Sequence, residues 1–209
     1  GIVHLGGDEA PTELWEKCPL CRKARTKAGM KDEQEQMRAF FAKTTVLLAK
    51  NGQTPQFWYE GNAGIYHPGE TVYAWRQDQA LQSIEKTKKA GLNLIMASNE
   101  YCYLDFPQIQ GQRNWGWMKT TTLQKCYELD PAFGKPEKEA GHIRGVHAPV
   151  WAERLPDLNH LLYRAYPRAC AIAEAGWSPM GVRSWENFRR KLADHRQFIL
   201  KRFNYDMER

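Results

Sequence analysis

The sequence lacks an apolar run of the roughly 18–20 residues that a membrane-spanning helix needs, so we expect no membrane span. It also lacks internal repeats and low-complexity tracts, which argues against solenoid arrays and long disordered segments. Hydrophobic residues make up 42% of the 209 residues and charged residues 26%, an ordinary balance for a folded globular protein. The chain is therefore long enough, and apolar enough, for one domain with a sizeable core.

Cysteine is scarce and odd in number, and five residues cannot form a complete set of disulfides within one chain. Cys18 and Cys21 form a CxxC pair, a spacing found in redox pairs and in half of a zinc site. No second CxxC or HxxxH follows at the spacing of a zinc ribbon, so two loop cysteines, free or bridged, are the simpler interpretation. Cys102 and Cys170 lie in apolar runs and are predicted core residues.

Acidic residues are outnumbered by basic ones, which gives a net charge of +6. A basic balance can indicate nucleic-acid binding. Here, however, Lys and Arg are interleaved with Glu and Asp along helical segments, and the densest basic group, residues 183–202, follows an amphipathic pattern. We therefore predict a solvated helix face there and no nucleic-acid partner.

Short apolar strand patterns alternate with helical patterns along the chain. Strands are predicted at residues 2–5, 56–60, 71–75, 93–98 and 143–153, and helices at 33–50, 78–91, 158–175 and 184–203. Asp32 is the expected N-cap of the first of these helices, and Asn51-Gly52 its end. A loop is expected to carry the CxxC pair, and the length of the irregular segment 108–138 favours a functional role.

This alternation is typical of an α/β fold in which helices bury a parallel sheet. Five strands could form an open, doubly wound sheet. They cannot form a complete (β/α)₈ barrel, which needs eight strands and about 250 residues.

Aromatic and acidic residues gather where the predicted strands end. They are Asp8 and Glu9, Trp58 and Glu60, Trp75, Tyr103 and Asp105, and Trp151 and Glu153. In a barrel of parallel strands, the carboxyl ends of the strands form the active-site face. Tryptophan rings stack on the C–H faces of sugars and carboxylates accept hydrogen bonds from hydroxyls, so this combination indicates a carbohydrate site.

Asp8 and Glu9 are neighbours in the sequence, which limits what they can do together. Two carboxylates are the usual equipment for glycoside hydrolysis, but an adjacent pair cannot flank a glycosidic bond as a separate acid and nucleophile do. The pair instead fits two different roles, in which Glu9 protonates the leaving oxygen and Asp8 orients or stabilises a group nearby. The nucleophile would then come from elsewhere, and the substrate itself is a candidate.

Residues His4 to Glu9, His-Leu-Gly-Gly-Asp-Glu, are similar to the H-x-G-G-D-E signature of glycoside hydrolase family 20, the β-N-acetylhexosaminidases. Further matches follow in order and cover nearly the whole chain: Trp58 with Glu60, Trp75 in Val-Tyr-Ala-Trp-Arg, Tyr103-Leu104-Asp105 and Trp151-Ala152-Glu153. The resemblance implies the C-terminal portion, about strands four to eight, of a (β/α)₈ TIM barrel. It also implies a retaining exo-hydrolase for glycans that end in β-linked GlcNAc or GalNAc, without metal or cofactor, in the periplasm or secreted.

The resemblance implies a substrate-assisted mechanism through an oxazolinium intermediate. Glu9 would act as general acid and then as general base. Asp8 would hold the N–H of the substrate's acetamido group, and Tyr103 would donate a hydrogen bond to the oxygen of that group.

Other matched residues would bind the sugar. The implied walls of the acetamido pocket are Trp58, Trp75 and Trp151, and the implied partners of the O4 and O6 hydroxyls are Asp105 and Glu153. Two roles stay open at this point. His4 is either a residue close to the acid pair or an ordinary core histidine, and Glu60 either supports the pocket or is an exposed loop acid.

The chain departs from the family pattern in its extent. The family places the signature at the end of the fourth barrel strand, whereas here it begins the chain, so residues 1–209 are expected to form a single partial catalytic domain. The first three strands, an arginine on the first strand and a preceding α/β domain are expected to be absent. Two unpaired sheet edges would follow, which favours self-association or pairing with a missing N-terminal segment.

Two other functions compete with hydrolysis. The first is an inactive glycan-binding fragment, which the expected lack of the first-strand arginine would favour. The second is a metal-dependent enzyme with donors drawn from His4, Asp8, Glu9, His67 and His147.

Overall fold

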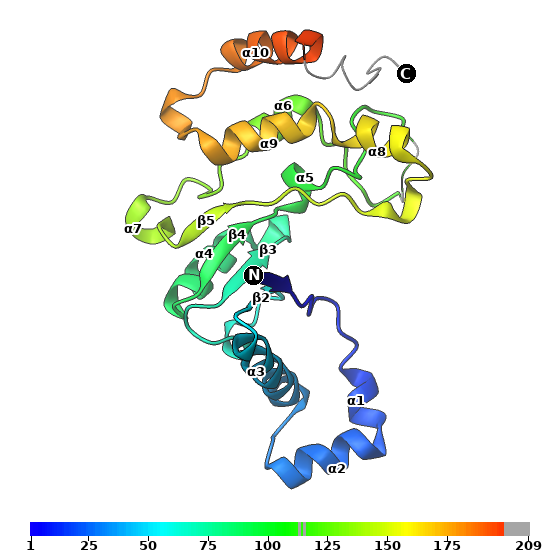
Figure 1. Cartoon of the computed structure of the whole chain (residues 1–209), viewed down its shortest axis with the longest axis vertical. Coiled ribbons are helices and arrows are strands. Elements are labelled where there is room, and N and C mark those ends of the chain that lie inside the picture. The colour runs from blue at the N-terminus through cyan, green and yellow to red at the C-terminus, as the bar shows by residue number, and fades with distance from the viewer. Residues whose placement is uncertain (113, 115, 199–209) are drawn as a thin grey trace.

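The computed structural model describes residues 1–112, 114 and 116–198, and a parallel sheet lies at its centre (Figure 1). The strands are β1 (Ile2–His4), β2 (Thr54–Trp58), β3 (Thr71–Ala74), β4 (Asn93–Met96) and β5 (Ile143–Val146). They lie in the order β1-β2-β3-β4-β5, and every neighbouring pair is parallel. The predicted parallel sheet is confirmed. Among the described residues, β1 and β5 each pair on one side only.

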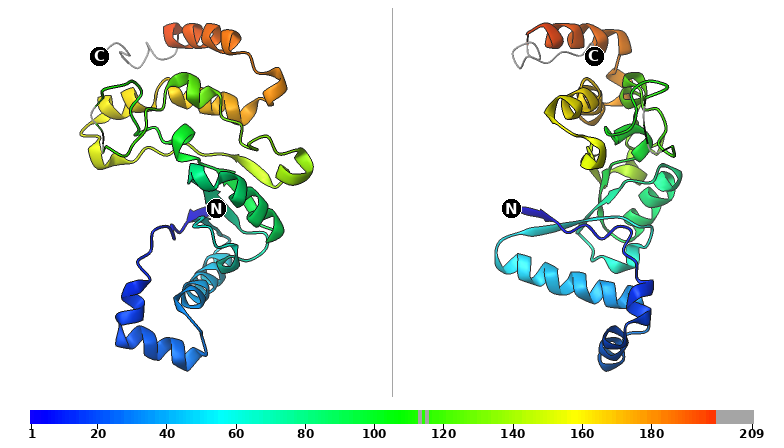
Figure 2. Two further views of the ribbon diagram at one scale, coloured as in Figure 1. Left: turned by 180° about the vertical axis from the view of Figure 1, so that it is seen from behind. Right: turned by 90° about the vertical axis from the view of Figure 1, so that its right-hand side faces the viewer.

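Helices connect and cover these strands. They are α1 (Glu13–Lys17), α2 (Pro19–Ala28), α3 (Glu33–Lys50), α4 (Ala80–Lys89), α5 (Asn99–Cys102), α6 (Leu123–Tyr127), α7 (Glu137–Ala140), α8 (Leu158–Ala165), α9 (Arg168–Trp177) and α10 (Trp185–Phe198), with 3₁₀ turns η1 (Ala63–Ile65), η2 (Gln77–Gln79), η3 (Ala152–Arg154) and η4 (Met180–Val182). The molecule is elongated, with α1 and α2 at one end and α10 at the other (Figures 1 and 2). No helix in the described part of the chain combines the length and the apolar character needed to cross a membrane.

Helix α3 forms where its sequence pattern predicts. The Asp32 side chain accepts a hydrogen bond from the Glu35 N–H at 2.8 Å, which satisfies one of the free donors of the first turn. Met37 and Phe41 are buried against the sheet, whereas Phe40 on the neighbouring side of the helix is 60% exposed. The apolar stripe of the helix is therefore only partly covered.

Two apolar clusters form the core. The first packs α3 and α4 against the sheet through Phe57, Val72, Ile84, Leu94 and Met96. The second joins α5, α6, α8, α9 and α10, with Leu104, Cys126, Leu129, Ile172 and Phe188 at its centre. As predicted, Cys102 is buried, whereas Cys170 is only partly buried at the edge of the second cluster.

Several predicted boundaries are wrong. The segment with Cys18 and Cys21 is helical rather than a loop, and 108–138 contains α6 and the start of α7. The predicted strand 143–153 ends at Val146, and the chain that follows contains Pro149, which has no N–H for a ladder bond. Helix 158–175 is two helices, because Pro167 cannot continue the helical hydrogen-bond ladder. The last predicted residues of the C-terminal helix, 199–203, lie outside the described residues.

Candidate functional site

A pocket of about 320 Å³ lies where the strands end. Its lining is Asp8, Glu9, Trp75, Tyr103, Asp105, Trp117, Met118, Trp151 and Glu153. Its volume is at the small end of the roughly 300–1,000 Å³ that is usual for ligand sites. Seven of these residues are predicted site residues, and the sequence patterns of four strands therefore converge on one cavity.

A glycine turn brings both adjacent carboxylates into this pocket. Gly6 and Gly7 have φ values of +70° and +99°, and Glu9 has a φ of +48°, which is uncommon for a residue with a side chain. A Cβ on Gly7 would lie 2.6 Å from Cζ of Phe41, inside any normal contact distance. The left-handed backbone and the close approach to Phe41 redirect the chain, so that Asp8 and Glu9 both line the pocket.

Replacement of Gly7 with Ala is expected to destabilise the protein by about 2–4 kcal/mol, since backbone strain and a clash with the buried Phe41 ring add together. Thermal unfolding of both proteins measures the difference. Gly52→Ala is the matched control, because Gly52 has a φ of +64° but a Cβ added there would meet no atom within 4 Å. Equal losses in the two variants would show that the Phe41 contact contributes nothing.

Aromatic rings form the walls of the pocket. Trp75 and Tyr103 are stacked, with ring centroids 6.3 Å apart and an angle of 19° between planes, and Tyr103 lies 6.1 Å from Trp151. Trp58 does not line the cavity. It is buried and packs against Trp151 at 5.9 Å and against His4 at 5.0 Å, so it supports a wall from outside.

Glu60 fixes the orientation of Trp75. Its Oε1 accepts a hydrogen bond from Trp75 Nε1 at 2.6 Å, and its Oε2 lies 3.4 Å from Nη2 of Arg76. That Arg76 nitrogen is 3.9 Å from Oε1 of Glu9, and the guanidinium lies 4.3 Å above the Trp75 ring. Glu60 is therefore a support of the pocket. Sequence reasoning missed Arg76, although it directly follows Trp75 in the matched motif.

Burial sets the protonation of Tyr103 and Asp105. Burial raises the pKa of Tyr103 well above its usual range, so the phenol keeps its proton and can donate it. Burial also raises the pKa of Asp105 to about 6, with Glu153 adding to the shift, and Oδ1 of Asp105 is buried with no partner. A sugar hydroxyl would supply the missing hydrogen bond.

Asp105→Asn is expected to stabilise the free protein at neutral pH. The raised pKa means that the folded state binds the Asp105 proton more tightly than the unfolded state, whose pKa is near 3.9. The free energy of unfolding therefore falls as pH rises from about 4 through about 6. Asparagine does not ionise, so the variant does not undergo this fall. After allowance for solvent screening, we expect a gain of about 1–2 kcal/mol at pH 7 and almost none at pH 4. Urea unfolding at both pH values measures it, and a gain that is the same at both would contradict the assignment.

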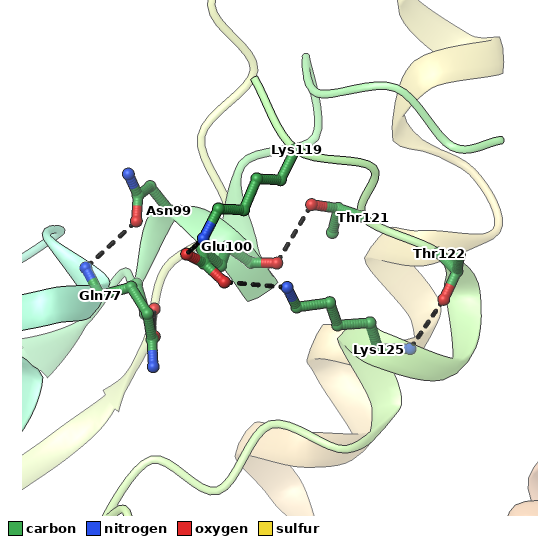
Figure 3. Close-up of polar contacts among 8 residues, drawn as sticks. Gln77, Asn99, Glu100, Lys119, Thr121, Thr122 and Lys125 are labelled. Carbon is green, nitrogen blue, oxygen red and sulfur yellow. Dashed lines mark hydrogen bonds and ion pairs between the residues drawn. The ribbon is translucent and has the colours of Figure 1, made fainter. Parts of the chain in front are cut away.

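Trp117 and Met118 line the pocket, and the residues that follow them are bound by Glu100 (Figure 3). The Glu100 carboxylate accepts hydrogen bonds from Lys119 at 2.5 Å and Lys125 at 3.0 Å, and these contacts, that of Lys119 first, lower the pKa of Glu100. Its carbonyl oxygen accepts from Thr121 Oγ1 at 3.0 Å. Trp117 and Met118 were not predicted individually, but they lie in the long segment whose length indicated function.

A buried arginine connects this segment to the strand-end residues. The side chain of Arg168 is fully buried, and it donates to the carbonyl oxygens of Thr121 at 2.9 Å, Leu104 at 2.5 Å and Arg164 at 2.6 Å. Burial lowers its pKa to about 10, which leaves it charged at neutral pH. Leu104 lies between Tyr103 and Asp105, and Thr121 follows Met118 by three residues, so Arg168 connects two segments that contribute residues to the pocket.

The donors proposed for a metal do not gather. Within residues 1–112, 114 and 116–198, no group of three or more His, Cys, Asp or Glu side chains could hold a metal ion. His4 instead accepts a hydrogen bond from the Gly6 N–H at Nδ1, 3.1 Å away, and its ring lies 4.8 Å from that of Tyr73. Burial lowers the pKa of both His4 and His147. His4 thus supports the glycine turn next to the acid pair.

Known proteins share this sequence and fold. The family model described as "Glycosyl hydrolase family 20, catalytic domain" matches residues 1–180. A β-hexosaminidase of Akkermansia muciniphila is 96% identical over all 209 residues, which are 42% of its length, and one of Porphyromonas gingivalis is 29% identical over 90% of this chain and 24% of its own. The chain thus spans less than half the length of these curated relatives.

Solved structures agree with the sequence matches. A crystal structure of a β-N-acetylhexosaminidase has 96% identity and a TM-score of 0.95, covering 100% of this chain and 44% of its own. The exo-β-N-acetylglucosaminidase of Vibrio harveyi, solved with N-acetylglucosamine, has 25% identity and a TM-score of 0.81, covering 93% of this chain and 31% of its own. The five parallel strands are part of the (β/α)₈ barrel of these enzymes, and the chain belongs to glycosyl hydrolase family 20.

Proposed function

We propose that this chain provides the sugar-binding and acid–base residues of a retaining exo-β-N-acetylhexosaminidase, which acts on glycans that end in β-linked GlcNAc or GalNAc. The observation that carries the proposal is that adjacent Asp8 and Glu9 share one small pocket with Tyr103 and three tryptophan rings. A separate carboxylate placed as nucleophile is not required if the sugar's own acetamido group attacks.

In the proposed first step, Glu9 donates its proton to the glycosidic oxygen as that oxygen leaves. The acetamido oxygen attacks the anomeric carbon and closes the oxazolinium ring. Asp8 accepts the acetamido N–H and offsets the positive charge that develops, while Tyr103 positions the attacking oxygen. In the second step, Glu9 removes a proton from water as the water oxygen bonds to the anomeric carbon. The bond from that carbon to the acetamido oxygen breaks, which opens the ring and leaves the anomeric configuration unchanged overall.

The aromatic walls support this mechanism by excluding water from the ring-closing step. Trp75 and Trp151 line the pocket directly, and Trp58 holds Trp151 from behind. Asp105 and Glu153 line the remaining side and are proposed to bind the O4 and O6 hydroxyls of the sugar. The unpartnered Oδ1 of Asp105 is suited to such an acceptor role.

The test compares chromogenic β-GlcNAc with the matching β-glucoside, using the whole protein that contains this chain. Hydrolysis of the GlcNAc substrate with negligible turnover of the glucoside is expected, because the glucoside carries no internal nucleophile. Comparable turnover of both sugars would overturn the proposed mechanism.

The second candidate is a glycan-binding fragment without activity. It is supported by the aromatic walls of the pocket and the unpartnered Oδ1 of Asp105, which suit a sugar whether or not a bond is cleaved. Binding of GlcNAc without hydrolysis, and equal background rates for the chain and its Glu9→Gln variant, would favour this candidate over the enzyme.

We further propose that residues 1–209 belong to one catalytic domain and that its outer strands β1 and β5 pair with a segment outside these residues. Ile2 on β1 is 68% exposed, which is unusual for the apolar residue of a parallel strand. Size-exclusion chromatography with light scattering tests the pairing: the isolated chain is expected to self-associate, and a stable, active monomer would contradict it.

A further inference from the structure

Two cysteines separated by Pro19 and Leu20 begin helix α2, at the end of the molecule opposite α10 (Figures 1 and 2). Cys18 is the N-cap residue and Cys21 is the third residue of the helix. Cys18 has an extended backbone, with φ −77° and ψ 118°, and its thiol lies within hydrogen-bond reach of the Cys21 thiol, so the two sulfurs are close enough for a disulfide to form. Both cysteines are free and partly exposed, so a small solute can reach them.

The two sulfurs differ in acidity. The N–H group and then the thiol of Cys21 lower the pKa of Cys18, and the charge of Arg22 adds to this effect. The pKa of Cys21 is raised, chiefly by its interaction with the Cys18 side chain. A nucleophilic thiolate beside a protonated thiol is the arrangement that thiol–disulfide exchange requires.

The surrounding charges favour the thiolate. The first turn of α2 carries no acidic residue, and basic residues continue along the helix as Arg22, Lys23, Arg25 and Lys27. Helix α1 contributes Lys17 together with Glu13 and Glu16. Arg25 is engaged elsewhere, in an ion pair with Glu33 at 2.7 Å and a hydrogen bond to Gln36 on α3 at 3.2 Å.

The other three cysteines provide a contrast within the same chain. Burial raises the pKa of Cys102, Cys126 and Cys170, so each remains a protonated and less reactive thiol at neutral pH. A metal site at the pair is less well supported, because zinc takes four ligands and the described residues place no third donor beside the two sulfurs.

We propose that Cys18 and Cys21 are a redox-active dithiol, which closes to an intramolecular disulfide by exchange with small organic disulfides. The Cys18 thiolate attacks one sulfur of the organic disulfide, forms a mixed disulfide and releases one thiolate. Cys21 then loses its proton and attacks the Cys18 sulfur, which forms the internal bond and releases the second thiolate. The two protein thiols are oxidised, and the organic disulfide is reduced to two thiols.

The test exposes the whole protein to oxidised glutathione and maps the modified peptides by mass spectrometry. The wild-type protein is expected to form the Cys18–Cys21 disulfide and to keep no glutathione. Cys21→Ser should retain one glutathione on Cys18, whereas Cys18→Ser should react at least about tenfold more slowly. Cys170→Ser is the control and should behave as the wild-type protein does.

A second measurement needs no variant. The rate of iodoacetamide alkylation is followed for each cysteine as a function of pH, and Cys18 should reach half its maximal rate at a lower pH than Cys170. Equal pH dependence, or glutathione that stays bound to the wild-type pair, would overturn the proposal. If the protein instead bound one equivalent of zinc, and zinc protected both thiols from alkylation, the pair would be a metal site and the redox proposal would be wrong.

Discussion

Glu9→Gln is expected to lower kcat for a β-GlcNAc substrate with a poor leaving group by about 10²–10⁴-fold, the usual contribution of general acid–base catalysis. The amide cannot deliver a proton, yet it has nearly the shape of the carboxyl group, so KM should change little. The side chain is 70% exposed, and loss of fold is therefore not expected to confuse the result. Steady-state kinetics of both proteins measure the effect.

Substrates with poor and good leaving groups distinguish proton donation by Glu9 from its other roles. Dinitrophenolate is a stable anion that can leave without a proton. The rate of the first step in Glu9→Gln should therefore recover with dinitrophenyl GlcNAc as substrate. Asp8→Asn and Tyr103→Phe should instead lose about 10²–10³-fold with either leaving group, since they act on the acetamido group. Because Glu9 also acts as base in the second step, the comparison uses kcat/KM, which reports the first step alone. Equal losses of kcat/KM for Glu9→Gln with both leaving groups would contradict its role as the acid.

Arg168→Met is expected to have the largest effect on stability, a loss of about 3–5 kcal/mol. Methionine fills much of the same space but leaves the buried carbonyl oxygens of Leu104 and Thr121 without their donor, at about 1–3 kcal/mol for each unsatisfied group, and removes the donor of the partly buried Arg164 carbonyl. Urea unfolding measures the loss. Because Leu104 lies between the pocket residues Tyr103 and Asp105, affinity for GlcNAc should fall as well.

Two further variants sharpen this prediction. Arg168→Lys keeps the charge but cannot reach three carbonyl groups as the guanidinium does, so it should recover only part of the stability. Arg190→Met is the surface control, since Arg190 is exposed and donates a hydrogen bond to Oδ1 of Asn187, three residues away, at 3.2 Å. A loss below about 1 kcal/mol for Arg168→Met would show that the buried contacts are not what holds the pocket together.

Local patterns predicted the elements that depend on local interactions. Asp32 followed by an apolar helical stripe predicts α3, and the structure confirms it because capping and periodicity act within a few residues. The boundary at Tyr166–Pro167 and the helix at the CxxC pair were missed, although both carry a proline whose position has a local meaning. These misses came from incomplete use of the local signals.

The pocket was predictable in part for a related reason. Parallel strands end at one edge, so residues after each strand must gather there, and Asp8, Tyr103 and Trp151 do so. No such rule predicts the positions of Trp117, Met118 and Arg168. Their positions depend on contacts between segments 19 to 64 residues apart, such as that of Arg168 with Leu104.

The sequence by itself determined the parallel sheet, the acid pair and its family, since each follows from short-range pattern or from a specific motif. Tertiary structure alone decided which residues close the pocket, that Trp58 supports a wall rather than lining it, and that Glu60 orients Trp75. It also decided the raised pKa of Asp105. The physical reason is that burial and long-range hydrogen bonds depend on every segment that packs around a group, and no local pattern contains that information.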